Sequence, residues 1–302
     1  MPNWSEILKE IGSSVSPHDR LRRKYLVRLW KHTKRNVIAY YSGWLQKGAI
    51  RQGGVSFEID DSDKNGFMTA VHKLDRSKGL DLLLHTPGGQ LSAAESIVDY
   101  LRTLFDNDIR AIVPQLAMSA GTLIALACNE IVMGKQSSIG PIDPQFGGTS
   151  AHGIVEEWET AKREIGANPN AAAYWQFILS KYGPSLVGDC QKAIAWSNTI
   201  AKEWLISGML RDEGDAIPKA NAIVQELGDH SLTLAHDRHI SMEKALSLGL
   251  KVSPLEQDPQ LQDAVLSVHH AMIHTLSATP AYKIIENHLG HAFINTVQLL
   301  PR

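Results

Sequence analysis

Short apolar segments recur through the first half of the chain and predict buried β-strands. Four of them occupy residues 37–41, 81–85, 109–113 and 130–134. They do not alternate between apolar and polar positions, which is typical of strands in a parallel sheet that is covered on both faces. Helical periodicity between them marks residues 67–74, 92–105 and 117–128. Strands and helices that alternate with short connections predict an α/β fold with mainly parallel strands.

The pattern becomes that of helices after a Gly/Pro-rich loop at residues 135–150. Its periodicity predicts helices near residues 153–165, 171–182, 187–209 and 217–227. A further short helix is expected to begin at Ser241, a favourable N-cap, and to end at Gly249. We therefore divide the chain into a basic helical segment (1–35), an α/β domain (36–255) and a helical tail (256–302).

Residues 20–35 carry eight Lys and Arg residues and no acidic residue. Leu21, Tyr25 and Leu29 recur every four residues, so the segment predicts a basic amphipathic helix. Two interpretations are open. The helix either contacts an anionic membrane surface peripherally, or packs on its own domain or a neighbouring subunit with its charges in solvent.

The composition limits the compartment and the partners. Of the 302 residues 43 % are apolar, and the formal net charge is −2, which argues against a nucleic-acid partner. Cys128 and Cys190 form no C-x-x-C pair, so a disulfide scaffold is excluded and a reducing compartment is favoured. The chain shows no apolar run of about 18 residues and no secretion signal at its N-terminus. We expect a cytoplasmic protein, with peripheral membrane association through residues 20–35 as the open addition.

A serine between small residues follows the third predicted strand. The segment Ala117-Met-Ser119-Ala-Gly121 approximates the nucleophile-elbow pattern G-x-S-x-G, with alanine in place of the first glycine. Small neighbours permit a sharp turn, and the start of a helix supplies free N–H groups for a developing oxyanion. Serine is also a common N-cap, so a nucleophile and a simple cap are both open at this point.

A second turn, Thr86-Pro-Gly88-Gly89, also follows a strand and precedes a helix. One of its glycine amides together with the amide of Ala120 could form an oxyanion hole, although a tight turn without a ligand would look the same in sequence. Both turns would lie at the carboxyl ends of parallel strands, where α/β proteins bind ligands. The rigid loop at residues 137–145 is a candidate lining of the same cleft.

Together these segments resemble a known family. TPGG before a helix, AMSAGTLIALACNEIVMG and SSIGPIDPQ are similar to Clp-fold serine peptidases, and most of all to the serine dehydrogenase proteinase family, a relative of signal peptide peptidase A. The resemblance covers residues 35–255 and includes VIAYYSGW, LLLHTPGGQLSAAESI and HDRHISMEKALSLGL. It implies a Clp/crotonase-like spiral of ββα units that self-associates into homo-oligomers. It also implies Ser119 as nucleophile and an oxyanion hole from the amides of Gly88, Gly89 and Ala120.

The general base is less well defined. The Clp subunit uses a histidine near the position where this chain has Asp-Pro-Gln, at residues 143–145. Signal peptide peptidases use a lysine further downstream, so we expect Lys162, 43 residues after Ser119, to be the base once burial has lowered its pKa. The alternative bases are Lys181, His152 and His236.

The expected activity is that of an ATP-independent serine peptidase acting on peptides or unfolded protein segments. An acyl-thioester hydrolase and a catalytically silent assembly protein on the same scaffold are the alternatives. Without a G-x-G-x-x-G or P-loop segment no nucleotide cofactor is implied, and no metal site is expected because His270 and His274 lack an H-E-x-x-H context.

Overall fold

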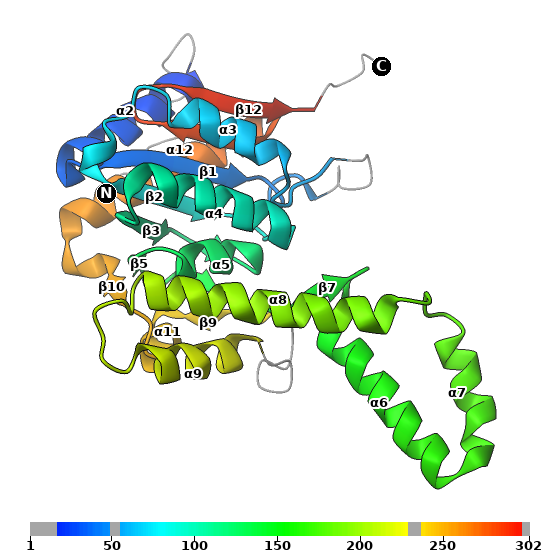
Figure 1. Cartoon of the computed structure of the whole chain (residues 1–302). Helices are drawn as coiled ribbons and strands as arrows, with labels where there is room; N and C mark the ends of the chain where they lie inside the picture. Colours follow the sequence, from blue (N-terminus) through cyan, green and yellow to red (C-terminus); the bar gives the residue numbers. More distant parts are fainter. Residues whose placement is uncertain (1–16, 49–54, 229–236, 298–302) are drawn as a thin grey trace, which may run out of the picture.

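The computed structural model of the chain describes residues 17–48, 55–228 and 237–297, and a seven-stranded sheet forms its centre (Figure 1). The strands are β1 (Asn36–Ser42), β2 (Leu80–His85), β3 (Ile109–Val113), β5 (Glu130–Met133), β10 (Val252–Pro254), β11 (Ala281–Asn287) and β12 (Ala292–Thr296), in the order β10-β5-β3-β2-β1-β11-β12. The five strands from β10 to β1 are parallel, whereas β11 and β12 pair antiparallel. The predicted α/β class and parallel strands are confirmed, and the crotonase-like spiral stays a prediction.

Helices cover both faces of this sheet. The helices are α2 (Pro17–Thr33), α3 (Ser62–Ala70), α4 (Leu91–Phe105), α5 (Ala120–Leu126), α6 (Ala151–Ala167), α7 (Ala172–Leu179), α8 (Leu186–Ser207), α9 (Ala216–Gly228), α11 (Met242–Ser247) and α12 (Pro259–Ala278). Successive side chains of a strand point to opposite faces, so Ile38 and Tyr40 join the larger core with α3, α4 and α5, whereas Val37 and Ala39 join the smaller core with α2 and α12. The helix expected at residues 67–74 begins earlier, at Ser62.

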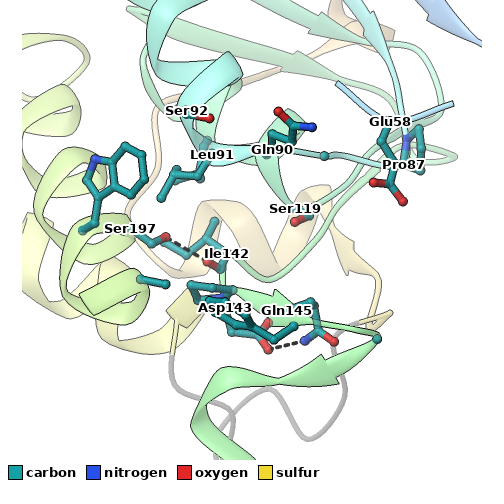
Figure 2. A pocket seen from close by; sticks show the side chains of 18 of the residues that line it. Glu58, Pro87, Gln90, Leu91, Ser92, Ser119, Ile142, Asp143, Gln145 and Ser197 are labelled. Atoms are coloured by element: carbon teal, nitrogen blue, oxygen red, sulfur yellow. Dashed lines mark hydrogen bonds between the residues drawn. The ribbon is translucent and has the colours of Figure 1, made fainter. Parts of the chain in front are cut away.

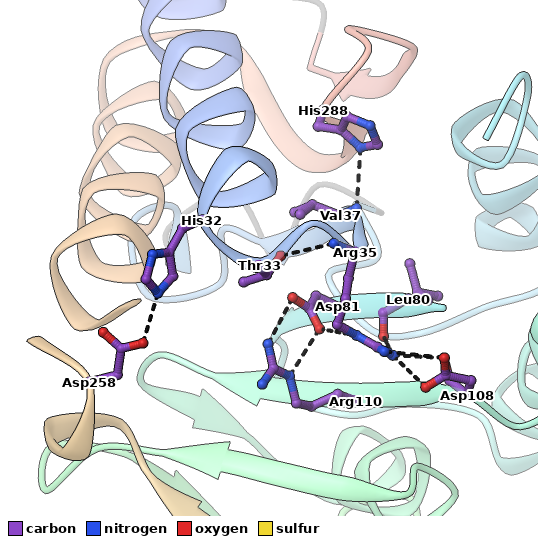
Figure 3. Close-up of polar contacts among 10 residues, drawn as sticks. All are labelled: His32, Thr33, Arg35, Val37, Leu80, Asp81, Asp108, Arg110, Asp258 and His288. Atoms are coloured by element: carbon purple, nitrogen blue, oxygen red, sulfur yellow. Dashed lines mark hydrogen bonds and ion pairs between the residues drawn. The ribbon is translucent and has the colours of Figure 1, made fainter. Parts of the chain in front are cut away.

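Helix α2 packs against α12 through the apolar positions that its sequence periodicity marks. Leu21, Tyr25 and Leu29 are buried there, and His32 binds Asp258, the N-cap of α12, at 2.8 Å (Figure 3). The packing interpretation thus describes the inner face of this helix. Membrane contact through its basic outer face stays a prediction. None of the helices in the described ranges is long and apolar enough to cross a membrane.

The C-terminal segment differs from the helical tail that we expected. Helix α12 confirms the expectation as far as Ala278, but β11 and β12 then form an antiparallel hairpin, and β11 pairs with β1 in the central sheet. Both strands contain β-branched and aromatic residues, and Gly290 with a φ of 87° lies in the turn between them. Tertiary pairing with β1 therefore decides the conformation of this segment.

Ion pairs hold the amino ends of the central strands together. Asp81 is fully buried and accepts hydrogen bonds from Arg35 at 2.9 Å and from Arg110 at 3.0 Å, while Arg35 also binds Asp108 (Figure 3). A buried carboxylate requires such partners. The amino edge of the sheet is thus occupied by structural contacts, and the carboxyl edge carries the two turns singled out in the sequence.

Two short sheets flank the carboxyl edge. The first joins β4 (Leu116–Ala117), β6 (Ser138–Ile139) and β9 (Ile240–Ser241), and the second is the hairpin of β7 (Gln145–Phe146) and β8 (Thr149–Ser150). From this hairpin α6 and α7 extend away from the body, and α8 leads back to it (Figure 1). We call residues 151–185 the arm.

Candidate active site

Ser119 stands at the junction between β4 and α5 in an unusual backbone conformation. Its φ is 50° and its ψ is −118°, although a side chain with a Cβ rarely adopts a positive φ. Its side chain makes no capping hydrogen bond to α5. Strain of this kind is stored where the surrounding structure enforces it, often at functional sites.

The turn at residues 86–89, which we call the glycine turn, lies directly opposite Ser119. Gly88 has a φ of 98°, and a Cβ added to it would meet the Cβ of Ser119 at 2.6 Å. Backbone hydrogen bonds join the two turns: the Thr86 N–H donates to the Leu116 carbonyl at 3.0 Å, and the Met118 N–H donates to the Thr86 carbonyl at 3.1 Å. The two turns therefore form one rigid unit, as their predicted positions at the carboxyl ends of strands suggested.

Three amides were expected to form the oxyanion hole, and their surroundings differ. The Gly88 N–H donates to Thr86 Oγ1 at 3.1 Å and is thus already engaged. The Gly89 and Ala120 N–H groups make no such bond within the described ranges, and both residues line the cavity beside Ser119. Gly89 and Ala120 are therefore the available donors.

A cavity of about 1070 Å³ opens in front of Ser119 (Figure 2). Its apolar lining comes from Pro87, Leu91, Leu123, Ile142, Phe146 and Trp196. Its ionisable lining in the described ranges consists of three carboxylates, Glu58, Asp143 and Asp237. A concave site with an apolar wall and a few polar groups is typical of substrate binding.

The loop at residues 137–150, which we call the wall loop, lies on the opposite side of the cavity and is held by backbone and side-chain hydrogen bonds. The Ile142 N–H donates to the Leu227 carbonyl and the Ser197 hydroxyl donates to the Ile142 carbonyl, both at 2.9 Å. Asp143 is buried and accepts a hydrogen bond from Gln145 at 3.0 Å. The sequence predicts that this loop lines the cleft and shows no histidine at residues 143–145, but no pattern in it marks the acid at position 143 as buried.

The lysines proposed as bases lie on the arm, outside the cavity lining. Lys162 is half-exposed and binds Glu159 at 2.7 Å. It lies eleven residues along α6 from Ala151, which corresponds to about 17 Å of helix. Lys181 is exposed, with its Nζ 4.9 Å from the centre of the Phe177 ring. Neither lysine is brought to Ser119 within one chain.

The two histidines proposed as bases are placed differently. His152 begins α6 next to the wall loop, and its Nε2 is buried without a hydrogen-bond partner in the described part of the chain, but it does not line the cavity. His236 lies outside the described residues. Asp237, the next residue, does line the cavity.

A buried histidine stands directly behind the glycine turn. His85 ends β2 on the α12 side, where its ring lies 4.5 Å from that of Trp44 and 5.3 Å from that of His269 (centre to centre). Burial lowers the pKa of His85 to about 3, because the imidazolium form cannot be solvated there. His85 is therefore neutral at physiological pH and belongs to the packing behind the site.

Similar proteins are found in Methanocaldococcus jannaschii. The uncharacterized protein MJ0137 is 33 % identical over 195 residues, which are 64 % of this chain and 59 % of MJ0137. The uncharacterized protein MJ1495 is 31 % identical over 222 residues, which are 70 % of this chain and 67 % of MJ1495. This chain therefore spans well under two thirds of the length of MJ0137.

One solved structure that aligns with this chain is a mutant of the 1510-N membrane-bound stomatin-specific protease. It is 19 % identical, with a TM-score of 0.38, and the alignment covers 65 % of this chain and 74 % of that chain.

The family described as ClpP-like SDH-type serine proteinase matches residues 20–261. This span runs from α2 to the start of α12, and it contains Ser119, the glycine turn and the wall loop. The match covers most of the chain and confirms the resemblance drawn from the TPGG and AMSAG segments. The chain belongs to the ClpP-like SDH-type serine proteinase family.

Proposed function

We propose that this protein is a serine peptidase that cleaves peptides or unfolded protein segments without ATP, with Ser119 as its nucleophile. The observation that carries the proposal is the backbone of Ser119, held at a φ of 50° at the rim of a cavity. An ordinary N-cap serine has extended φ/ψ values and accepts a hydrogen bond from the first turn of its helix. Ser119 does neither, which favours the nucleophile over the cap.

The mechanism follows from the groups around Ser119. Its Oγ attacks the carbonyl carbon of the peptide bond and passes its proton to a base, and the carbonyl oxygen becomes an oxyanion. The N–H groups of Gly89 and Ala120 donate hydrogen bonds to that oxyanion. These hydrogen bonds strengthen as negative charge develops on the oxygen. The base then protonates the leaving amine, and water hydrolyses the acyl-enzyme by the same route.

We propose His236 as the base in preference to Lys162. Asp237 lines the cavity, so the chain returns to the site at the residue that follows His236. An imidazole of ordinary pKa accepts a proton near neutral pH. Lys162, in contrast, is half-exposed on the arm. It could act as a base only if it were desolvated, which would require it to enter the cavity of a second copy of the chain.

Self-association belongs to the same proposal. The arm carries Tyr174 and Phe177, whose exposed fractions are 65 % and 70 %. Aromatic side chains exposed this far from the core are enriched in protein interfaces. A second copy of the chain that covers the arm would bury them.

Replacement of the nucleophile tests the function directly. Ser119→Ala should lower peptide hydrolysis by about 1000-fold or more and abolish labelling by a fluorophosphonate, because the attacking oxygen is gone. Ser247 is exposed on α11 and does not line the cavity, so Ser247→Ala is the control and should keep both hydrolysis and labelling. Wild-type turnover in Ser119→Ala would rule out the assignment.

A further inference from the structure

A buried lysine of the C-terminal hairpin contacts the segment that precedes α3. Lys283 lies on β11 and is only 1 % exposed. Its Nζ donates to the Glu58 carbonyl oxygen at 2.8 Å, and it forms ion pairs with Asp63 at 2.9 Å and with Asp60 at 3.3 Å. A buried ammonium is tolerated only when it is paired and hydrogen-bonded in this way.

The segment that Lys283 binds is itself attached to the glycine turn. We call residues 57–60 the strap. The Ile59 N–H donates to the Gly88 carbonyl at 2.7 Å, and the Gln90 N–H donates to the Ile59 carbonyl at 2.9 Å. The Gly88 carbonyl belongs to the same planar peptide group as the Gly89 N–H, and the Gln90 N–H belongs to the next peptide group. The strap therefore fixes the peptide group that carries the Gly89 amide and the one that follows it.

The strap also lies against Gly89 with no space between them. A Cβ added to Gly89 would meet the backbone nitrogen of Ile59 at 2.3 Å and its carbonyl oxygen at 2.4 Å. Any movement of the strap toward the turn is therefore blocked, and any movement away breaks the two hydrogen bonds. The position of the Gly89 amide follows the position of the strap.

We propose that Lys283 is a positioning residue of the Ser119 site, which clamps the strap and through it holds the Gly89 amide in place as an oxyanion donor. The clamp comes from β11, which lies outside the residues 20–261 that the family match covers. The consequence for catalysis rests on the function proposed above, whereas the clamp on the strap does not.

The same strand offers a matched control. Glu286 of β11 is buried and pairs with buried Arg22 of α2 at 2.7 Å. This ion pair resembles the Lys283–Asp63 pair in burial and charge, but it lies on the α2 side of the sheet and does not contact the strap. Arg22→Met thus removes the buried α2 cation that pairs with β11, without touching the clamp.

The first measurement is hydrogen exchange in the full-length protein, which does not depend on activity. Lys283→Met should speed exchange of the Ile59 and Gln90 amides, because the strap loses its hold on one side. Arg22→Met should leave these two amides at their wild-type rates. Equal rates for Lys283→Met and wild type, or equal acceleration in both variants, would overturn the clamp.

The second measurement is the rate of fluorophosphonate labelling of Ser119 per folded molecule. Lys283→Met should slow it by up to about 100-fold, the effect of a small misplacement of a catalytic group, and Arg22→Met should not. Faster amide exchange with wild-type labelling would overturn the positioning role. Wild-type protein that fails to label would instead contradict the proposed function and leave the clamp standing.

A milder variant guards against a failure to fold. Asp60 is partly exposed, and its Oδ1 binds Ser62 while its Oδ2 faces Lys283. Asp60→Asn keeps an oxygen for Ser62 and removes the charge that Lys283 binds. It should change both readouts in the same direction as Lys283→Met by a smaller factor, and wild-type values for both would contradict the proposal.

Discussion

The site around Ser119 and the arm are close in the chain but differ in almost every physical respect. The turns that form the site are joined by backbone hydrogen bonds and contain a strained serine and two glycines that touch neighbouring backbone. The arm is regular helix with exposed Lys162, Tyr174 and Phe177, and its Gly166 has open space around it. Tertiary contacts hold the backbone of the proposed site in conformations that its residues disfavour locally. The arm, in contrast, keeps a locally favoured helical conformation and exposes its side chains.

The largest expected effect is on peptide hydrolysis, and it tests whether the general base lies beside Ser119 or on the arm. His236→Gln should lower peptide hydrolysis by about 100-fold to 10000-fold, the usual effect of a lost general base. Lys162→Met should leave hydrolysis unchanged, because Lys162 lies on the arm and pairs with Glu159. The opposite pattern in the two variants would transfer the base to the arm and break the comparison.

The next effect compares one glycine from each region. Gly88→Ala should slow labelling of Ser119 by about 100-fold, because the new Cβ would meet Ser119 and the φ of 98° strains any side chain. Gly166→Ala should instead raise the free energy of unfolding, by less than the roughly 0.5–1 kcal/mol typical of the middle of a helix, because Gly166 lies in the last turn of α6. Labelling kinetics and urea unfolding measure the two outcomes. A fully active Gly88→Ala would show that the close approach of the two turns is not needed.

Acid should weaken the site region through His85. The pKa of His85 is about 3 in the folded chain and near 6.5 when unfolded. Between these values only the unfolded chain is protonated there, so stability is complete above pH 6.5 and falls as the pH drops toward 3. The loss is about 1.4 kcal/mol per pH unit for one such group. The free energy of unfolding, measured with urea at several pH values between 7 and 5, should depend less on pH in His85→Phe than in wild type. An unchanged pH dependence would contradict this prediction.

The smallest effect on the folded single chain is expected at the arm. Phe177→Ser removes an exposed ring, so the free energy of unfolding should stay within about 0.5 kcal/mol of wild type. Self-association, measured by sedimentation, should nevertheless weaken, because burial of an aromatic side chain contributes about 1.5–3 kcal/mol. The change Lys192→Ser on exposed α8 is a control that should alter neither property. Undiminished association in Phe177→Ser would leave the arm without the role proposed for it.

Local patterns were sufficient where the chain decides its structure locally. The largely apolar runs predicted β1, β2, β3 and β5, because strands buried on both faces need apolar residues at most positions. Ser119 and the glycine turn were found from small residues at strand ends. Distances along the chain were less informative: Lys162 has a suitable spacing from Ser119, but α6 points away from the body (Figure 1).

Contacts between segments that lie far apart in the sequence could not be predicted. No local signal indicates that β11 lies beside β1, or that Lys283 meets Asp60 and Asp63 more than 200 residues earlier in the sequence. Tyr282, Ile284 and Ile285 in β11 and the glycine in the following turn would have predicted the hairpin, but not its neighbour in the sheet. The Asp143 side chain was likewise hidden, because an acid in a Pro-rich loop has no pattern that marks it as buried.

The position of β11 also has a consequence for biosynthesis. Because more than 200 residues separate β1 from β11 in the chain, one edge of β1 has no partner while those residues are being translated, and an unpaired strand edge invites association with other chains. The strap likewise lacks its clamp until Lys283 has been added. A nascent chain therefore carries Ser119 long before the strap is clamped, and the activity proposed for Ser119 should arise only after β11 has been synthesised.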